Sequence, residues 1–146
     1  MPVTIGSVSP AHFPAILTFW VEAATVPSST DDLEGLLALY VRDPDCVIVA
    51  TEDDAIVGTL IVGWDGWRGA FYRLAVHPSH RRAGLGRALV VEGEARLARL
   101  GVRRINLFAV GTHGPAVAFW KALGYQCDPG HLRFARNLMR APDPRT

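Results

Sequence analysis

Apolar residues recur along the chain with two different periods, and each period predicts one kind of secondary structure. Over residues 10–24 and 33–41 they follow the i, i+3, i+4 spacing that is typical of an amphipathic helix. The same spacing covers residues 84–100, and residues 114–125 have the pattern of a shorter helix. We therefore expect four helices.

Six further segments have the length and apolar pattern of strands: residues 3–8, 46–52, 55–64, 69–78, 103–110 and 131–138. Asp53 and Asp54 predict a tight hairpin turn, and the WDGWRG segment predicts the next one, so three successive antiparallel strands are expected. The order strand-helix-helix-strand-strand-strand-helix-strand-helix-strand predicts an α/β (α+β) fold with a mixed, mostly antiparallel sheet flanked by helices. No repeat or linker interrupts residues 1–146, which predicts a single domain.

Local chemistry indicates where the helices begin and which way they face. Ser9 and Pro10 suit the start of the first helix, and Thr30 or Asp31 can cap the second. In the third helix, one face would hold Gly86, Leu89, Val90, Gly93, Leu97 and Leu100, and the outer face Arg87, Glu92, Arg96 and Arg99. Because glycine destabilises a helix interior relative to alanine, Gly93 predicts close packing against a neighbouring element.

The start of the third helix has an unusual composition. Residues 77–90 read HPSHRRAGLGRALV, with Arg81 and Arg82 before Gly84 and Gly86. A helix N-terminus offers unpaired N–H groups and the positive end of the helix dipole, so it favours an anion. Glycine lets a ligand approach the backbone, and arginine is well matched to phosphate. The segment therefore predicts a site for a phosphate-bearing ligand.

Spacing separates this segment from two other glycine-rich phosphate sites. A P-loop needs G-x-x-x-x-G-K-[ST], but the only lysine in the chain is Lys121. A dinucleotide fingerprint needs a third Gly or Ala, but Leu89 stands there and no acidic residue closes a strand about twenty residues later. Neither motif fits.

Composition limits the class of protein further. With 49% hydrophobic and 20% charged residues, the chain is expected to form a soluble globular domain. It has no apolar run of roughly 18 residues and no signal-peptide pattern, so we expect no membrane partner and a cytoplasmic location. Cys46 and Cys127 share no metal-ligand spacing, so neither a metal site nor a disulfide is expected.

Charge is divided unevenly along the chain. Residues 1–65 hold ten acids and one base, a formal charge of 1 − 10 = −9, and residues 66–146 hold four acids and 14 bases, a charge of 14 − 4 = +10. This division is compatible with an anionic ligand on the second half and a cationic one near the first, or with acids that only decorate solvent-facing surfaces.

The Leu-Ala-Val-His-Pro segment 74–78, followed by R-x-x-G-x-G at residues 81–86, resembles the acetyl-CoA-binding motif of the GCN5-related N-acetyltransferase (GNAT) superfamily. The expected element order is similar to that fold along nearly the whole chain. The resemblance implies that backbone N–H groups and arginines bind the CoA pyrophosphate, and that the preceding strand binds pantetheine and the thioester. The residues implied to bind acetyl-CoA are Leu74, Ala75, Val76, Arg81, Arg82, Ala83, Gly84, Leu85, Gly86, Arg87, His113 and Phe119.

The second half of the family signature is matched with two departures. Residues 113–125 resemble N-x-x-A-x-x-F-Y-x-x-x-G-F, but His113 stands where the family often has asparagine, and Trp120 where it often has the tyrosine that protonates the leaving thiolate. Indole has no usable acidic proton. Tyr72 and His113 are the residue types that could take over proton transfer, while packing and helix capping are their alternative roles.

The acceptor site is expected at the junction of the first two helices, the WDGWRG turn and the last strands. Trp64, Asp65 and Trp67 could form an aromatic wall with a carboxylate for an ammonium group. Arg68 and Arg73 could instead bind a substrate carboxylate. The alternative is a tight turn whose tryptophans cover the core.

The resemblance implies an acetyl-CoA-dependent N-acetyltransferase that acts on a primary amine by direct attack in a ternary complex. The missing tyrosine leaves a non-catalytic acyl-CoA-binding module as the alternative. Nucleic-acid binding is disfavoured because the pI is about 7.9 and the basic residues do not alternate with exposed aromatic residues. The sequence leaves open a homodimer and does not identify the amine.

Overall fold

The structure, a computed structural model, describes residues 2–23, 25–109 and 114–138. The chain divides into two compact units, which adjoin in sequence between Leu107 and Phe108. The single domain expected over residues 1–146 stays a prediction.

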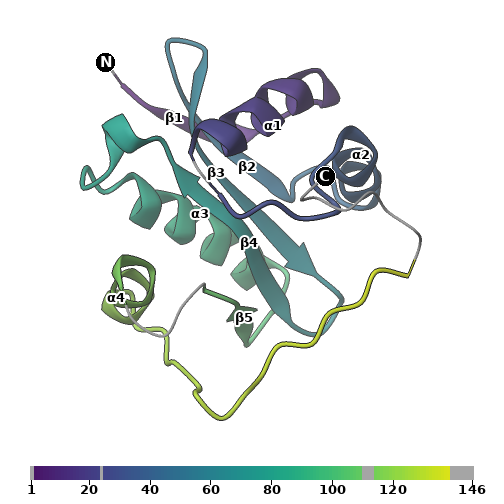
Figure 1. The fold of residues 1–146 in the computed structure, drawn as a ribbon, viewed down its shortest axis with the longest axis vertical. Helices are drawn as coiled ribbons and strands as arrows, with labels where there is room; N and C mark the ends of the chain where they lie inside the picture. Colours follow the sequence, from purple (N-terminus) through teal and green to yellow (C-terminus); the bar gives the residue numbers. More distant parts are fainter. Residues whose placement is uncertain (1, 24, 110–113, 139–146) are drawn as a thin grey trace. The chain divides into compact units, whose positions relative to one another are not determined.

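The first unit is built around a five-stranded sheet (Figure 1). Its strands lie side by side in chain order: β1 (Thr4–Ser7), β2 (Val47–Glu52), β3 (Ala55–Trp64), β4 (Gly69–Val76) and β5 (Ile105–Leu107). All neighbours are antiparallel except β4 and β5, which are parallel. Asp53 and Asp54 both have positive φ, as a two-residue hairpin turn requires. The predicted α/β (α+β) class with a mixed, mostly antiparallel sheet is confirmed.

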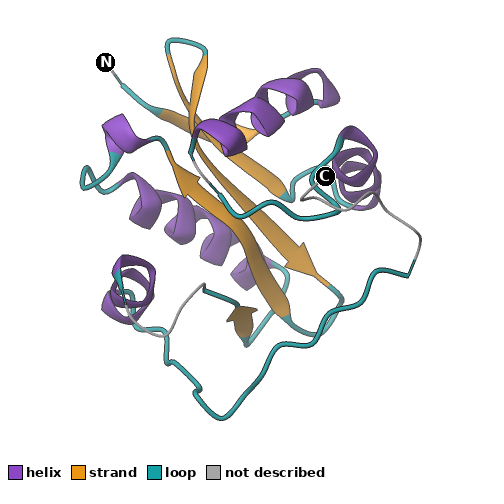
Figure 2. Cartoon of the chain, viewed as in Figure 1, coloured by secondary structure: helices purple, strands orange, loops and turns teal. Residues whose placement is uncertain are grey.

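The α-helices lie where the periodicity predicts them. The helical segments are η1 (Pro10–His12), α1 (Phe13–Glu22), α2 (Leu33–Arg42), η2 (Pro78–His80) and α3 (Leu85–Arg99), with α4 (Pro115–Ala122) in the second unit. The short η2 was not predicted. Figure 2 shows the helices of the first unit against the strands of the sheet. The core under α1 and α2 includes Phe19, Leu36 and Val49, whereas Leu60 and Phe71 contact α3. The two faces of the sheet are therefore covered by different helices.

Gly93 is the point of closest approach between α3 and the sheet. A Cβ atom there would lie 2.8 Å from Leu60 Cδ2 and 2.9 Å from Phe71 Cε1. Real Cβ atoms do not approach carbon so closely, so a larger residue would force α3 away from the sheet. The close packing predicted at Gly93 is confirmed.

Two residues of α3 depart from the predicted faces. Leu100, predicted on the buried face, is exposed just after the helix ends. Leu85, which was not assigned to that face, is buried. Arg96, predicted on the outer face, has a side chain only 14% exposed. Its guanidinium reaches Ser7 at the end of β1, where Nη2 donates a hydrogen bond of 2.9 Å to Oγ. The helical pattern of apolar residues counts arginine as polar, so it does not predict that a long arginine side chain can extend to a buried position.

Two further predictions need correction. Asp32, not Thr30 or Asp31, caps α2, because its Oδ1 accepts a hydrogen bond from the Gly35 N–H at 2.7 Å. The predicted strand over residues 131–138 is absent from the described part of that segment. Its apolar residues Leu132 and Phe134 are exposed. A strand also needs a neighbouring strand to accept and donate its backbone hydrogen bonds, and the alternation of apolar and polar residues does not provide one.

Candidate active site

The turn before α3 leaves backbone donors open. Arg82 and Gly84 both adopt positive φ, 66° and 80°, which turns the chain sharply after η2. The first helical hydrogen bond is donated by the Ala88 N–H to Gly84 O at 3.0 Å. The N–H groups of Leu85, Gly86 and Arg87 therefore occupy the first three helical positions, where no intrahelical acceptor exists. Such a group of donors suits a phosphate oxygen.

The three arginines of this turn differ in their surroundings. Arg81 folds back onto the protein, with Nε 3.3 Å from Val76 O and Nη2 3.4 Å from Ala23 O. Arg82 and Arg87 are exposed and make no hydrogen bond or ion pair with other described residues. Arg81 thus fastens the turn to β4 and the end of α1, and Arg82 and Arg87 remain open to a ligand.

The end of β4 lies beside this turn and has one edge without a strand partner. β5 pairs only with Gly69, Ala70 and Phe71 of β4. From Tyr72 to Val76, β4 pairs with β3 alone within the described chain. Leu74, Ala75 and Val76 therefore lie on the part of the strand whose β5-facing edge is not used by the sheet. The backbone groups on this edge are therefore available to a ligand, as the expected binding of pantetheine by this strand requires.

A bulge interrupts β4 in front of these residues. The β3–β4 register shifts between Thr59 and Ile61, and Arg73 has a φ of 53°, in the left-handed region that non-glycine residues rarely adopt. The buried Thr59 hydroxyl donates to Arg73 O at 2.9 Å and accepts from Trp20 Nε1 at 2.9 Å. These bonds fix the backbone of the bulge to α1.

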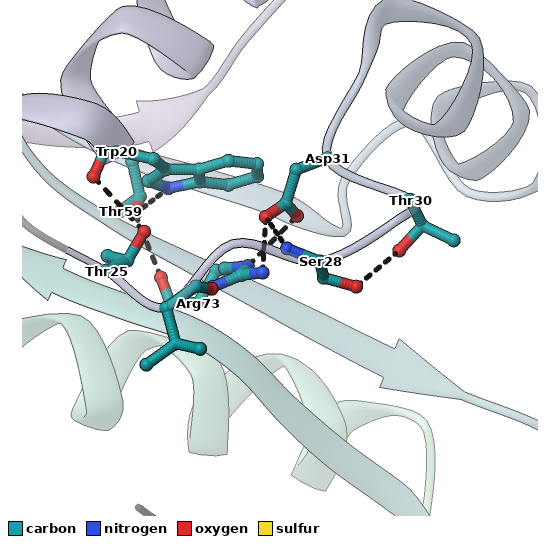
Figure 3. Close-up of polar contacts among 8 residues, drawn as sticks. Trp20, Thr25, Ser28, Thr30, Asp31, Thr59 and Arg73 are labelled. Atoms are coloured by element: carbon teal, nitrogen blue, oxygen red, sulfur yellow. Dashed lines mark hydrogen bonds and ion pairs between the residues drawn. The ribbon is translucent and has the colours of Figure 1, made fainter. Parts of the chain in front are cut away.

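The Arg73 side chain is held by the α1–α2 connection (Figure 3). Its guanidinium pairs with both carboxylate oxygens of Asp31, donates to Val26 O at 2.6 Å and lies 5.4 Å from the Trp20 ring centre. The Arg73 and Asp31 side chains are only 17% and 19% exposed. Arg73, predicted as a substrate ligand, thus has a carboxylate partner within the chain. Sequence reasoning missed this pairing because its members are 42 positions apart.

We expect Asp31→Ala to destabilise the protein by about 2–4 kcal/mol, because it leaves the Arg73 charge mostly buried without its carboxylate. Urea unfolding followed by tryptophan fluorescence measures this. Arg68→Ala is the matched control, since Arg68 stacks on the exposed Trp67 ring at 3.9 Å and should change stability by about 0.5 kcal/mol or less. A loss below about 1 kcal/mol for Asp31→Ala would show that the pair has little structural role.

The other predicted acceptor residues lie at the opposite end of β4. Asp65 Oδ1 accepts from the N–H groups of Trp67 and Arg68, each at 2.8 Å, and these backbone hydrogen bonds lower the pKa of Asp65. The hairpin precedes Gly69, whereas the arginine turn follows Val76, seven strand steps or about 23 Å further along. Trp64, Asp65 and Trp67 are therefore not brought together with Arg73 or with the turn.

Of the two predicted proton donors, Tyr72 is described by the structure and His113 is not. Tyr72 lies directly before the bulge and is 53% exposed, so it is not a packed core aromatic. Gly63 on β3 makes room for its ring, because a Cβ there would lie 3.1 Å from Tyr72 Cε2. His113 lies outside the described residues. Phe119 belongs to the second unit, where its ring packs edge-on against Trp120 at 5.1 Å.

The two cysteines have different environments. Cys46 is buried, and desolvation with the nearby Asp43 charge raises its pKa from the ordinary 9.0 to about 12, whereas Cys127 is exposed. At neutral pH a thiol-specific reagent should therefore modify Cys127 at least about 10³-fold faster, because the thiolate is the reactive form. Mass spectrometry after a timed exposure measures the ratio, and comparable rates would contradict the burial of Cys46.

Among the residues that the structure describes, no group of three or more His, Cys, Asp or Glu side chains could hold a metal ion. The described helices are also each too short or too polar to cross a membrane.

A family model described as "Acetyltransferase (GNAT) family" matches residues 13–125. Acetyltransferase SG1711 of Sodalis glossinidius is 29% identical over 127 residues, 87% of this chain and 89% of that protein. Acetyltransferase ECA0875 of Pectobacterium atrosepticum is 30% identical over 114 residues, 78% of this chain and 81% of that protein. PaiA N-acetyltransferase of Thermoplasma acidophilum, solved in complex with coenzyme A, has a TM-score of 0.76 at 16% identity, covering 90% of this chain and 94% of that one.

Sequence and fold thus agree on the class of protein, an acetyltransferase. The chain belongs to the GNAT family, whose members use acetyl-CoA as the acyl donor.

Proposed function

We propose that this acetyltransferase transfers the acetyl group from acetyl-CoA to a primary amine of a small molecule, peptide or protein, by direct attack in a ternary complex. The observation that supports this most is the turn before α3. It combines three N–H groups without intrahelical acceptors with two exposed arginines that lack partners in the described chain. Donors and charges of this kind match a pyrophosphate.

In this proposal the loop from Arg81 to Arg87 binds the phosphates of acetyl-CoA. Arg82 and Arg87 supply charge-assisted hydrogen bonds, the N–H groups of Leu85, Gly86 and Arg87 supply backbone donors, and Arg81 holds the turn in place. The pantetheine arm would follow the unpaired edge of β4 at Leu74, Ala75 and Val76. The contributions of His113 and Phe119, which the family resemblance implies, stay predictions. Backbone N–H groups of this edge would stabilise the oxyanion of the tetrahedral intermediate.

The acceptor amine is placed next to the β4 bulge. Of the regions expected from the sequence, the junction of α1 and α2 is the one held against β4, through Arg73 and Asp31. The hairpin with Trp64, Asp65 and Trp67 lies at the far end of the strand, so it is the less favoured acceptor region. An amine at the bulge would meet the thioester halfway along β4, where the strand edge is unpaired.

The chemistry requires one proton to be lost and one to be gained. The neutral amine nitrogen attacks the thioester carbonyl carbon, the C–S bond breaks, the new amide nitrogen loses a proton and the CoA sulfur gains one. Tyr72, exposed and adjacent to the bulge, is proposed as the donor to the sulfur. His113 is the alternative donor or a relay, because an imidazole can accept and donate a proton.

The proposal is tested by titrating the full-length protein with acetyl-CoA in a calorimeter and by measuring CoA thiol release in the same preparation. The acceptor panel contains polyamines, amino acids, aminoglycosides and peptides with free N-termini. We expect saturable binding and thiol release that depends on one acceptor class. Mass spectrometry of the acceptor then identifies the acetylated amine.

Other outcomes have separate meanings. Tight acetyl-CoA binding without release for any amine would favour a non-catalytic acyl-CoA-binding module, for which the tryptophan at position 120 is the supporting observation. Absence of acetyl-CoA binding would contradict the assignment of the loop.

A further inference from the structure

A cavity of about 490 Å³ lies toward the opposite end of α3 from the arginine turn. Its walls come from the C-terminal ends of α2, β3 and α3 and from the segment that enters β2. The turn precedes Leu85, and the first α3 residue that lines the cavity is Arg96, so about 17 Å of helix separates them. The cavity is therefore separate from the proposed acetyl-CoA site.

Arg96 supplies a mostly buried positive charge to this cavity. Its Nη2 donates to Ser7 Oγ, and its Nε lies 3.5 Å from Glu92 Oε1. Nη1 is buried and has no hydrogen-bond acceptor among the described residues. A buried guanidinium nitrogen without an acceptor costs free energy, so the protein itself does not fully satisfy the Arg96 side chain that lines the cavity.

Two further arginines line the same cavity near its surface. Arg42 ends α2 and Arg99 ends α3. Both are exposed, and the structure gives neither a hydrogen bond nor an ion pair with any described residue. Cations near a helix C-terminus are common because they oppose the helix dipole. That effect explains either arginine alone, but it does not explain why both line one cavity with the unsatisfied Arg96.

The other lining residues limit the charge and shape of a ligand. Asp43 and Asp45 also line the cavity, so the formal charge of the lining residues is 3 − 2 = +1, while Glu92 lies beside Arg96 outside the lining. This favours a monoanion and opposes polyanions, unlike the turn before α3, which has three arginines and no acid over residues 77–87. Val62, Trp64, Leu97 and Leu100 give the cavity an apolar wall.

We propose that this cavity binds a small organic monocarboxylate, with its carboxylate between the arginines and its hydrocarbon part against the apolar wall. Arginine matches a carboxylate in geometry as well as in charge. A volume of about 490 Å³ lies within the range of small-molecule sites, roughly 300–1,000 Å³. Binding at this site does not depend on the acetyl-transfer reaction.

The test is calorimetric titration of the full-length protein with sodium acetate, butyrate and phenylacetate, each with and without saturating CoA. We expect saturable binding that strengthens from acetate to phenylacetate and is unaffected by CoA. Arg42→Gln and Arg99→Gln should each weaken phenylacetate binding about tenfold, the value of one charge-assisted contact. Arg103→Gln, an exposed arginine away from the cavity, is the matched control and should bind as the unaltered protein does.

Several results would overturn the proposal. These are no saturable binding of any of the three carboxylates, equal binding by both arginine variants and the unaltered protein, or inorganic phosphate binding as tightly as phenylacetate. Displacement of phenylacetate by CoA would assign the carboxylate to the acetyl-CoA site instead. Failure of acetyl transfer in the separate amine assay would leave the cavity result unchanged, so the two proposals are distinguishable.

Discussion

Replacing both Arg82 and Arg87 with alanine is expected to weaken acetyl-CoA binding by about 100-fold. Each exposed charge-assisted hydrogen bond to phosphate contributes about 1.5 kcal/mol, which is about tenfold in the dissociation constant. Both side chains are free of partners in the described structure, so their removal should leave the fold intact. Calorimetric titration with acetyl-CoA measures the effect, and circular dichroism confirms folding.

The salt dependence of acetyl-CoA binding, compared with that of a matched control variant, shows whether lost phosphate contacts cause the weaker binding. Each arginine that neutralises a phosphate should add to the salt dependence of binding, because the attraction between exposed charges is screened. The double variant should therefore bind acetyl-CoA with a weaker salt dependence than the unaltered protein. Arg103→Ala removes an exposed arginine from another loop and should change neither quantity. Unchanged affinity in the double variant would mean that the phosphates bind elsewhere.

Arg81 should respond differently from its neighbours. Its guanidinium donates to Val76 O and Ala23 O, so its loss acts on the position of the turn as well as on charge. The sequence treats Arg81, Arg82 and Arg87 alike, as cations near glycines at a helix start. The structure separates the one that holds the turn from the two that are open to a ligand.

Local patterns predicted most of the first unit. The periods of three to four and of two located α1, α2, α3 and the hairpin strands, because burial of one face is a local property of sequence. Gly93 could be predicted as a contact point for the same reason. The acidic hairpin turn at Asp53 and Asp54 followed from the short loop between two strand patterns.

The contacts that the sequence did not predict join residues far apart in the chain. The Arg73–Asp31 pair and the Thr59 bridge to Trp20 join positions separated by 42 and 39 residues, and nothing local indicates either contact. Arg96 was misplaced because a helical pattern records polarity and not the reach of a long side chain. The strand expected over residues 131–138 failed because a ladder needs a partner strand that a single segment cannot specify.

The missed bulge changes how the proposed active site is understood. Arg73 was a candidate for a substrate carboxylate, yet it connects the α1–α2 junction to the strand that carries the thioester in our proposal. A substrate carboxylate would have to displace Asp31. Tyr72 directly precedes Arg73 in the strand, so the proposed proton donor is adjacent in sequence to the residue that this junction holds.

We expect Tyr72→Phe to lower kcat by about 10²–10⁴, the usual contribution of a positioned general acid, while the KM for acetyl-CoA stays nearly constant. The phenylalanine ring retains the packing over Gly63, so only the hydroxyl proton is lost. Steady-state kinetics with the acceptor found in the amine panel measure both constants. Tyr40→Phe is the matched control, because Tyr40 packs edge-on against Phe13 in the core and should have no effect on kcat.

The same kinetics on His113→Ala distinguish the two proton donors. If Tyr72 protonates the CoA sulfur, its variant should lose the larger factor, and the loss should shrink with an activated acyl donor whose leaving thiol is more acidic, because that sulfur departs without a proton. A fall in kcat of less than about threefold for Tyr72→Phe would contradict its role. A large fall confined to His113→Ala would assign the proton to the histidine, and a small effect of both would indicate that water protonates the departing sulfur.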